Sequence, residues 1–289
     1  MAFLDRSSSV VHGLRGRARR SELNAMKAEE RRLRQSVIDA CLTMNTSGFN
    51  QGTSGNISAR WKDGLLITPS GIPYEALTPE DIAWMDMNGE YEHSLRPSSE
   101  WRIHRDIIAE RPDVGAVVHA HPPYATALAI NRMEIPPVHY MVVVSGGGNI
   151  RVAEYATYGT EVLSQYVLEA MEGRTACLMA NHGMVATGPT VERALWVARE
   201  VEALARQYTI ALQVGTPTLL TDEEVAESLA KLSNYGLRSK AAPAKARTDP
   251  KTKAISKTKM VAKTKASSKA KPVAKKKRPA RKRSVVSGR

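Results

Sequence analysis

The stretch Val117-Val118-His119-Ala120-His121-Pro122-Pro123 joins a short apolar run to two histidines that stand two positions apart. Residues 114–119 are apolar, rich in valine and bounded by turn-forming residues, so they predict a short buried strand. Side chains two positions apart in a strand point to the same face, so we expect His119 and His121 to project together at its end. Such a pair is typical of a divalent metal site, although two hydrogen-bonded histidines without a metal also fit the spacing.

On both sides of this strand the chain alternates between helical and extended patterns. Apolar residues at intervals of three and four predict helices at 27–48, 97–108, 123–129, 160–171, 190–212 and 221–234. Apolar or alternating runs bounded by turn residues predict strands at 57–60, 65–68, 82–86, 114–119, 176–180 and 184–187. Because hairpins of neighbouring strands mix with helices, we expect an α/β protein with a mixed sheet covered by helices.

The net charge of +13 is concentrated at the C-terminal end of the chain. From Arg238 onward there are 20 Lys and Arg and one acidic residue, Asp249, whereas the rest of the chain has 22 basic and 28 acidic residues. Residues 239–289 have no apolar face whose burial would offset chain entropy, so we expect a disordered Lys/Ala/Pro-rich tail. Residues 1–25 are polar and Arg-rich and predict a flexible arm, which leaves 26–238 as one folded domain.

The cysteine content bears on the compartment. The two cysteines, Cys41 and Cys177, lie far apart in a predicted helix and a predicted strand, so neither a disulfide framework nor a Cys-rich zinc site is expected. No run approaches the roughly 18 apolar residues of a membrane span. The basic N-terminus is not followed by the apolar region of a secretory signal. We therefore expect a cytoplasmic protein that does not bind membranes.

Three loops of small and turn-forming residues stand at 52–56, 68–71 and 97–99. Each offers backbone N–H groups, hydroxyls or an amide, and the last one precedes a predicted helix, where unpaired N–H groups and the helix dipole favour an anion. Each loop by itself is also an ordinary turn. A phosphate site requires the three loops to converge, which their spacing does not establish.

Glu100 and His182 have the chemistry to complete a site with the histidine pair. Glu100 stands in the expected first turn of a helix whose N-cap is a serine, where a carboxylate either interacts with the helix dipole or, if it faces a metal, transfers a proton. His182 ends a predicted strand and is either a third metal-binding imidazole or an ordinary surface histidine. The only lysines before the tail are Lys27, Lys62 and Lys231. None lies in an apolar strand, the setting that activates a lysine for Schiff-base chemistry, so carbanion chemistry here requires a metal.

A series of ordered motifs makes the chain resemble class II aldolases of the aldolase/adducin family, and among them bacterial L-fuculose-phosphate aldolase most. The motifs are NQGTSGNIS (50–58), LITPSGIPYE (66–75), PSSEW (97–101), AVVHAHPPYATALA (116–129), HYM (139–141), YATYGT (155–160), NHG (181–183), ALW (194–196) and YGLR (235–238). They span about residues 29 to 238. The resemblance implies a three-layer α/β/α sandwich around a mixed, mostly antiparallel sheet, and a homotetramer with active sites at subunit interfaces.

The resemblance also implies a role for each matched residue. His119, His121 and His182 would bind Zn²⁺ or another divalent metal, and Glu100 would be a further ligand and the catalytic acid/base. The residues expected to bind the substrate phosphate are Asn56, Ser70, Gly71, Ser98 and Ser99. Tyr140, from a neighbouring subunit, would transfer a proton at the aldehyde oxygen. Tyr158 stands where the aldolase has a phenylalanine at the aldehyde end, and Tyr235 matches a mobile C-terminal tyrosine; both are expected to bind the substrate.

The implied reaction cleaves a ketose 1-phosphate, such as L-fuculose 1-phosphate, to dihydroxyacetone phosphate and an aldehyde such as L-lactaldehyde, through a metal-stabilised enediolate. The tyrosine at position 158 leaves the substrate open. The alternatives within the family are a 5-deoxyribulose 1-phosphate aldolase, a ribulose-phosphate 4-epimerase and a methylthioribulose-phosphate dehydratase. An adducin-like scaffold without metal is the non-enzymatic alternative. The basic tail either binds nucleic acid or another polyanion non-specifically or is simply solvated.

Overall fold

A seven-stranded sheet lies at the centre of the domain in the computed structural model, which describes residues 7–233 and the side chains of 27–232. The strand order is β3-β2-β1-β4-β7-β6-β5, and every neighbouring pair is antiparallel except β5 and β6. The prediction of a mixed, mostly antiparallel sheet is therefore confirmed. The C-terminal tail, Tyr235 and residues 1–6 lie outside the described residues.

The predicted strands are all present, with small shifts at their ends. The strands are β1 Asn56–Trp61, β2 Gly64–Ile67, β3 Ala83–Asp86, β4 Ala116–Ala120, β5 Val152–Ala153, β6 Ala176–Met179 and β7 Gly183–Gly188. Only β5 was not predicted, because two residues are too few to show an alternating pattern. The histidine-bearing strand β4 takes the middle place of the sheet.

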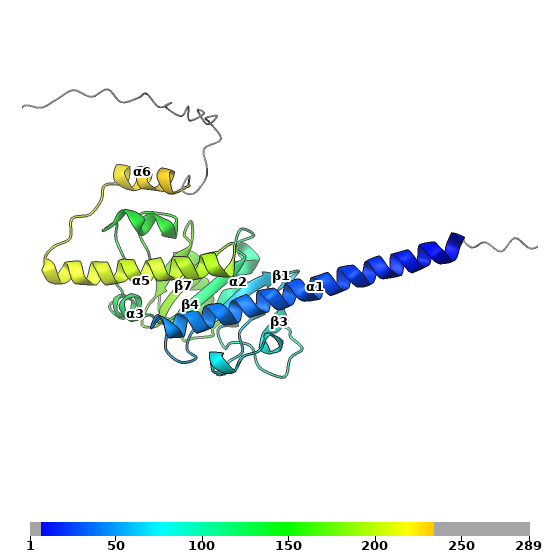
Figure 1. The fold of residues 1–289 in the computed structure, drawn as a ribbon. Coiled ribbons are helices and arrows are strands. Elements are labelled where there is room, and N and C mark those ends of the chain that lie inside the picture. Colours follow the sequence, from blue (N-terminus) through cyan, green and yellow to red (C-terminus); the bar gives the residue numbers. More distant parts are fainter. Residues whose placement is uncertain (1–6, 234–289) are drawn as a thin grey trace, which may run out of the picture. The chain divides into compact units, whose positions relative to one another are not determined.

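Helices cover both faces of the sheet, which gives the expected three layers (Figure 1). The helices are α1 Ser7–Thr46, α2 Trp101–Glu110, α3 Pro123–Ile130, α4 Glu161–Ala170, α5 Val191–Val214 and α6 Asp222–Ser233, with short 3₁₀ helices η1 Tyr74–Ala76, η2 Pro79–Asp81 and η3 Tyr140–Ser145. One face packs against α1, α3 and α5, and the other against α2 and α4. No helix within residues 7–233 is long and apolar enough to span a bilayer.

The alternation of side chains along β4 separates the two cores. Ala116, Val118 and Ala120 belong to the core shared with α1 and α5, whereas Val117 belongs to the core shared with α2 and α4. Because side chains alternate along a strand, His119 shares the face of Val117. The first histidine thus lies on the side of the sheet where the N-terminus of α2 carries Glu100.

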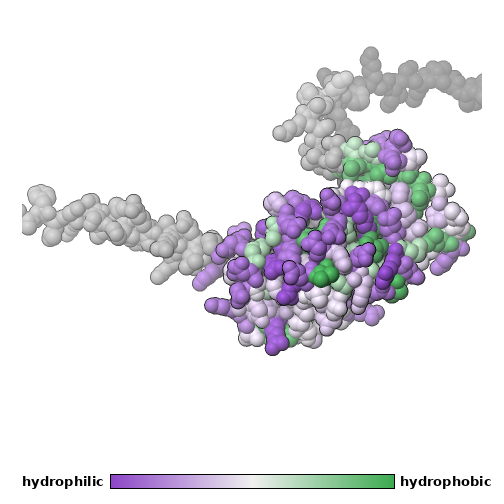
Figure 2. All heavy atoms as spheres, turned by 180° about the vertical axis from the view of Figure 1, so that it is seen from behind, coloured by the Kyte–Doolittle hydropathy of each residue, from purple (hydrophilic) through white to green (hydrophobic). Residues whose placement is uncertain are grey.

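The outer surface on this side of the sheet is mainly polar. In Figure 2, which views the domain from behind, most of the exposed residues are hydrophilic, and the hydrophobic ones form separate small patches. Amphipathic helices produce such a surface, because each buries one apolar stripe and turns its polar residues outward. On α2 the buried stripe contains Ile103, Ile107 and Ile108.

Two helix starts differ from the predictions. Helix α1 begins at Ser7 rather than near Lys27, because Ala, Arg, Leu and Glu are good helix formers and sustain a helix without a periodic apolar face. Helix α2 begins at Trp101, and its N-cap residue is Glu100, which makes no side-chain capping bond. A serine was expected as the N-cap of this helix. Instead, Ser98 Oγ accepts a hydrogen bond from the backbone N–H of Glu100, at 3.2 Å.

Candidate active site

Three histidines converge at one end of the sheet. His119 and His121 stand at the end of β4, and His182 lies in the turn between β6 and β7. Because Ala120 pairs with Met184, the start of β7 lies beside the end of β4. The three ring centroids are 4.8–5.0 Å apart, and each ring offers a nitrogen within 4.8 Å of the others. The three rings are close enough to share one ion.

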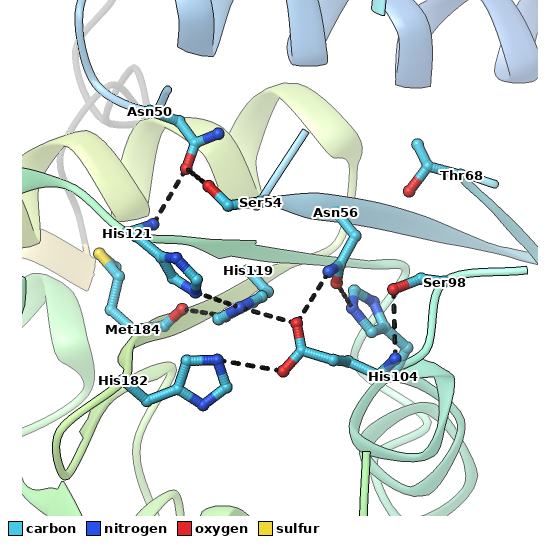
Figure 3. A network of polar contacts seen from close by, with 12 residues as sticks. Asn50, Ser54, Asn56, Thr68, Ser98, His104, His119, His121, His182 and Met184 are labelled. Atoms are coloured by element: carbon cyan, nitrogen blue, oxygen red, sulfur yellow. Dashed lines mark hydrogen bonds and ion pairs between the residues drawn. The ribbon is translucent and has the colours of Figure 1, made fainter. Parts of the chain in front are cut away.

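The carboxylate of Glu100 faces this cluster, whose three histidines are labelled in Figure 3, from the N-terminus of α2. Glu100 is 5% exposed, and its Oε2 lies 3.0 Å from His119 Nε2. Oε2 also accepts a hydrogen bond from Asn56 Nδ2, at 3.1 Å. Oε1 lies 3.2 Å from His182 Nε2 but has no hydrogen bond to any described residue.

The cluster fixes the charge of its members. Burial raises the pKa of the Glu100 carboxyl, but attraction to the imidazoles of His119 and His182, whose nitrogens lie close to its oxygens, outweighs burial and holds that pKa well below its usual range. Burial, together with repulsion from His119 and His182, lowers the pKa of His121 to about 3. The pKa of His119 is raised, because the attraction and hydrogen bond of Glu100 outweigh the effect of burial. The carboxylate is thus ionised, and His121 is a neutral imidazole.

These residues fit a divalent cation. His119 Nδ1 donates to the backbone carbonyl of Met184, at 2.9 Å, which directs Nε2 of His119 toward the cluster. Nε2 of His119 also lies 3.0 Å from Nε2 of His121. Imidazole nitrogens that converge beside a buried carboxylate oxygen without a hydrogen bond form a donor set suited to zinc and similar ions.

The three small-residue loops converge beside the cluster. They line one pocket of about 380 Å³ together with Glu100, His121 and His182. The loop residues that line it are Thr53, Ser54, Gly55, Asn56, Pro69, Ser70, Gly71, Ser98 and Ser99, which include all five predicted phosphate-binding positions. Of the described residues that line the pocket, none is a lysine or an arginine.

Two of the loops are tied together by their backbones. Ser70 N–H donates to the carbonyl of Arg96 and Ser98 N–H to that of Thr68, both at 2.9 Å, on either side of a bridge between Pro69 and Pro97. The N–H groups of Ser70 and Ser98 are therefore already used. Within the described residues, the hydrogen-bond donors that remain without a partner in these loops include the N–H groups of Gly71 and Ser99 and the hydroxyls of Ser70 and Ser99.

The predicted tyrosines are distributed unevenly. Tyr158 lines the pocket and is 66% exposed. Tyr140 lies in η3 and lines a separate groove with Trp196 and Lys231, so the structure does not bring it to the pocket of its own chain. Tyr140 is 58% exposed and thus free for contact with a neighbouring subunit, as predicted for it.

Several site residues were missed from the sequence. Tyr155 and Asn181 line the pocket, and Asn181 has the left-handed backbone (φ 54°) that turns the chain between β6 and β7. His104 and Asn50 lie behind the pocket, where Asn50 Oδ1 accepts a hydrogen bond from the backbone N–H of His121, at 3.1 Å. Only His104 had a usable signal, since it follows Glu100 by one helical turn on the buried face of α2.

Comparison with known proteins places this geometry in a family. The model of the class II aldolase and adducin N-terminal domain matches residues 35–209. The 5-methylthioribulose-1-phosphate/5-deoxyribulose-1-phosphate aldolase of Rhodospirillum rubrum is 52% identical over 71% of this chain and 92% of its own length. The L-fuculose phosphate aldolase of Escherichia coli K12 is 47% identical over 73% of this chain and 98% of its own length.

A solved structure of L-fuculose 1-phosphate aldolase superimposes with a TM-score of 0.68 and 40% identity, over 70% of this chain and 96% of that one. The similarity therefore spans the fold as well as the motifs that carry the histidines, Glu100 and the small-residue loops. These relatives are named as aldolases, so the adducin-like scaffold is not supported. The chain belongs to the class II aldolase and adducin family and is a metal-dependent aldehyde-lyase of the class II aldolase type.

Proposed function

We propose that this enzyme cleaves a ketose 1-phosphate, such as L-fuculose 1-phosphate, between C3 and C4, and so releases dihydroxyacetone phosphate and an aldehyde such as L-lactaldehyde. The observation that carries the proposal is the single pocket in which a carboxylate and two of the three clustered histidines adjoin the small-residue loops. Such a pocket accommodates both ends of a small phosphorylated substrate, because the phosphate and the reacting carbons need different neighbours.

The loops supply the phosphate end of the pocket. Their donors are the N–H groups of Gly71 and Ser99 and the hydroxyls of Ser70 and Ser99, with Asn56 and Ser98 beside them. Neutral donors at a helix N-terminus bind a phosphate dianion through oriented dipoles, without a lysine or arginine. Held in this way, the substrate would present its reacting carbons to the histidine cluster in one orientation.

The histidine cluster and Glu100 supply the chemistry of bond cleavage. His119, His121 and His182 would hold a divalent ion, Zn²⁺ in this proposal, which when bound would supply Lewis-acid stabilisation of the charge left on the dihydroxyacetone phosphate fragment. Glu100 delivers the proton that C3 gains in cleavage, and its ionised form removes that proton in synthesis. In cleavage the phenolate of Tyr140, from a neighbouring subunit in a homotetramer, takes the proton of the C4 hydroxyl, and in synthesis the phenol returns it to the aldehyde oxygen. The proton that Glu100 gives up thus equals the one that Tyr140 gains.

A second substrate is favoured by one specific observation. The relative with 52% identity is named for 5-methylthioribulose 1-phosphate and 5-deoxyribulose 1-phosphate, against 47% for the L-fuculose phosphate aldolase of E. coli K12. Cleavage of any of these three ketose 1-phosphates releases dihydroxyacetone phosphate, and the three differ in the aldehyde that is formed. Tyr158, at the pocket and largely exposed, is placed to contact that variable end.

Turnover of L-fuculose 1-phosphate beside 5-deoxyribulose 1-phosphate, with and without chelator, tests the proposal. We expect release of dihydroxyacetone phosphate from at least one of them, lost on chelation and restored by Zn²⁺. Conversion without any release of dihydroxyacetone phosphate would instead favour the epimerase or the dehydratase. Turnover that chelation does not change would contradict the metal.

The C-terminal tail carries a separate proposal. With 20 Lys and Arg against a single acidic residue from Arg238 onward, it would bind DNA, RNA or another polyanion by counterion release. Deletion of residues 240–289 would then abolish retention on DNA at low salt while turnover is unchanged. Equal retention of both proteins would refute the idea.

We place the enzyme in the cytoplasm, which is consistent with the two free, buried cysteines.

A further inference from the structure

Four buried polar residues form an unbroken line that ends at the catalytic carboxylate, and its middle members, Asn56 and His104, are labelled in Figure 3. Ser58 and His104 are fully buried, and Asn56 and Glu100 are each 5% exposed. Ser58 Oγ lies 2.8 Å from His104 Nδ1, His104 Nε2 lies 2.5 Å from Asn56 Oδ1, and Asn56 Nδ2 lies 3.1 Å from Glu100 Oε2. A buried line of this kind has to satisfy every member, because each unpaired group would cost stability.

The line exists because a strand and a helix contribute alternately to it. Asn56 and Ser58 stand two positions apart in β1, so both face α2. Glu100 and His104 stand four positions apart at the start of α2, so both face the sheet. His104 lies between the two side chains of the strand, where one ring nitrogen reaches each of them.

The direction of each hydrogen bond follows from the carboxylate. An ionised carboxylate only accepts, so the amide group of Asn56 that faces Glu100 is its NH₂, and its carbonyl oxygen faces His104. His104 must therefore donate from Nε2. Burial, followed by repulsion from His119, lowers the pKa of His104 to about 3, so the ring is neutral and carries one N–H. Its Nδ1 is then bare and accepts the hydroxyl hydrogen of Ser58.

The opposite orientation of the Asn56 amide is unfavourable at both ends. With the amide turned over, its oxygen would face the carboxylate of Glu100, and its NH₂ would face the N–H of His104. Each contact would oppose groups of like polarity in a buried place, where an unsatisfied polar group costs about 1–3 kcal/mol. The Nε2–H of His104 and the carboxylate of Glu100 thus favour the same orientation of the Asn56 amide.

We propose that His104 is a positioning residue, which through its Nε2–H fixes the amide of Asn56 and through Asn56 holds the Glu100 carboxylate in place for proton transfer. The inference rests on the proposed role of Glu100 as acid/base. His104 itself does not line the pocket, so it acts only through Asn56. Ser58 completes the arrangement, because its hydroxyl donates to the bare Nδ1 of His104.

The tautomer of His104 tests the inference without reference to turnover. Long-range ¹H–¹⁵N correlation spectra of the ¹⁵N-labelled full-length chain, with Zn²⁺ bound, distinguish a protonated ring nitrogen from a bare one. We expect His104 to carry its hydrogen on Nε2 and to have a bare Nδ1. A hydrogen on Nδ1, or a doubly protonated ring, would overturn the inference whatever the substrate proves to be.

A pair of variants tests the consequence for catalysis. His104→Gln retains an N–H donor for Asn56, whereas His104→Leu removes it. Loss of a residue that supports a metal-site ligand typically costs about 10- to 100-fold in activity or metal affinity, so we expect His104→Leu to lower kcat by that factor with a smaller change in KM. His104→Gln should recover most of the loss.

The control is Thr187→Val, which removes another buried hydroxyl of the sheet, one that donates to the carbonyl of Thr175. It should leave kcat unchanged. Equal kcat values for His104→Leu and His104→Gln would overturn the inference, since a purely structural histidine would give no rescue. If His104→Leu does not fold, the tautomer measurement on the unmodified chain decides. If neither ketose phosphate is turned over, the proposed function fails, and the tautomer result still stands.

Discussion

The two faces of strand β1 bury unlike kinds of residue. Ile57 and Ala59 pack into the apolar core beside α1 and α5, whereas Asn56 and Ser58, on the opposite face, hydrogen-bond to groups of α2. Apolar packing tolerates a change of partner when volume is conserved, but a buried polar group depends on one particular partner. The difference teaches that one set of alternate positions supports the fold and the other supports the site.

The largest loss of activity is expected from a substitution in the histidine cluster, which lies beside the polar face of β1. His119→Ala removes a fully buried imidazole of the cluster. We expect loss of bound metal and a fall in kcat greater than the roughly 100-fold cost of changing a residue that only supports a ligand. Metal analysis of the purified variant measures the bound metal, and the rate of dihydroxyacetone phosphate release measures kcat. A variant that keeps its metal would contradict the assignment of this histidine.

The opposite face is tested by a change that should affect stability alone. Ile38 of α1 is 2% exposed in the apolar core, and Ile38→Ala should lower the free energy of unfolding by about 2–5 kcal/mol through the cavity that it leaves. Denaturant titration measures the loss. The kcat of the folded variant should equal that of the unmodified enzyme, and a parallel fall in kcat would show that the two faces are not separable.

The pH dependence of stability sharpens the comparison further. The pKa of folded His104 is lowered to about 3, so between that value and the ordinary histidine pKa of about 6.5 the unfolded chain binds more protons than the folded one. Stability should therefore fall as the pH falls below about 6.5, with a contribution from His104 of up to roughly 1.4 kcal/mol per pH unit. Unfolding of the unmodified chain and of His104→Gln at a series of pH values isolates this contribution. Parallel curves for the two proteins would refute it.

The smallest change in kinetics is expected from a substitution at the exposed edge of the pocket. Tyr158 is 66% exposed, so Tyr158→Phe should leave stability unchanged. The loss of one hydroxyl should shift the ratio of kcat/KM for L-fuculose 1-phosphate and 5-deoxyribulose 1-phosphate by about tenfold or less. Steady-state kinetics on both substrates measures the shift. An unchanged ratio would show that Tyr158 does not contact the part of the substrate that differs.

The sequence predicted what depends on local periodicity. The alternation in β4 places His119 and His121 together, and the apolar periods of α2 and α5 fix which faces these helices bury. Periodicity does not encode register between distant segments. The pairing of Ala120 with Met184, which brings His182 to the cluster, was therefore expected only from the family resemblance.

The missed features depend on contacts that no local pattern records. The early start of α1 follows from residue propensity without a periodic face, and the short helix η3 was not predicted. The line from Ser58 to Glu100 requires β1 and α2 to be placed side by side before the donor and acceptor roles can be assigned. The role of Tyr140 depends on a neighbouring subunit and stays a prediction.

The bridge between Pro69 and Pro97 has a consequence for how this pocket can change its substrate. The hydrogen bonds on either side of the bridge join main chain to main chain, from Ser70 to Arg96 and from Ser98 to Thr68. A point substitution that leaves the backbone in place alters what a loop offers without altering the gap between the two loops. We therefore expect the gap between these two loops to stay the same through point mutations and to change only with an insertion or a deletion in one of them.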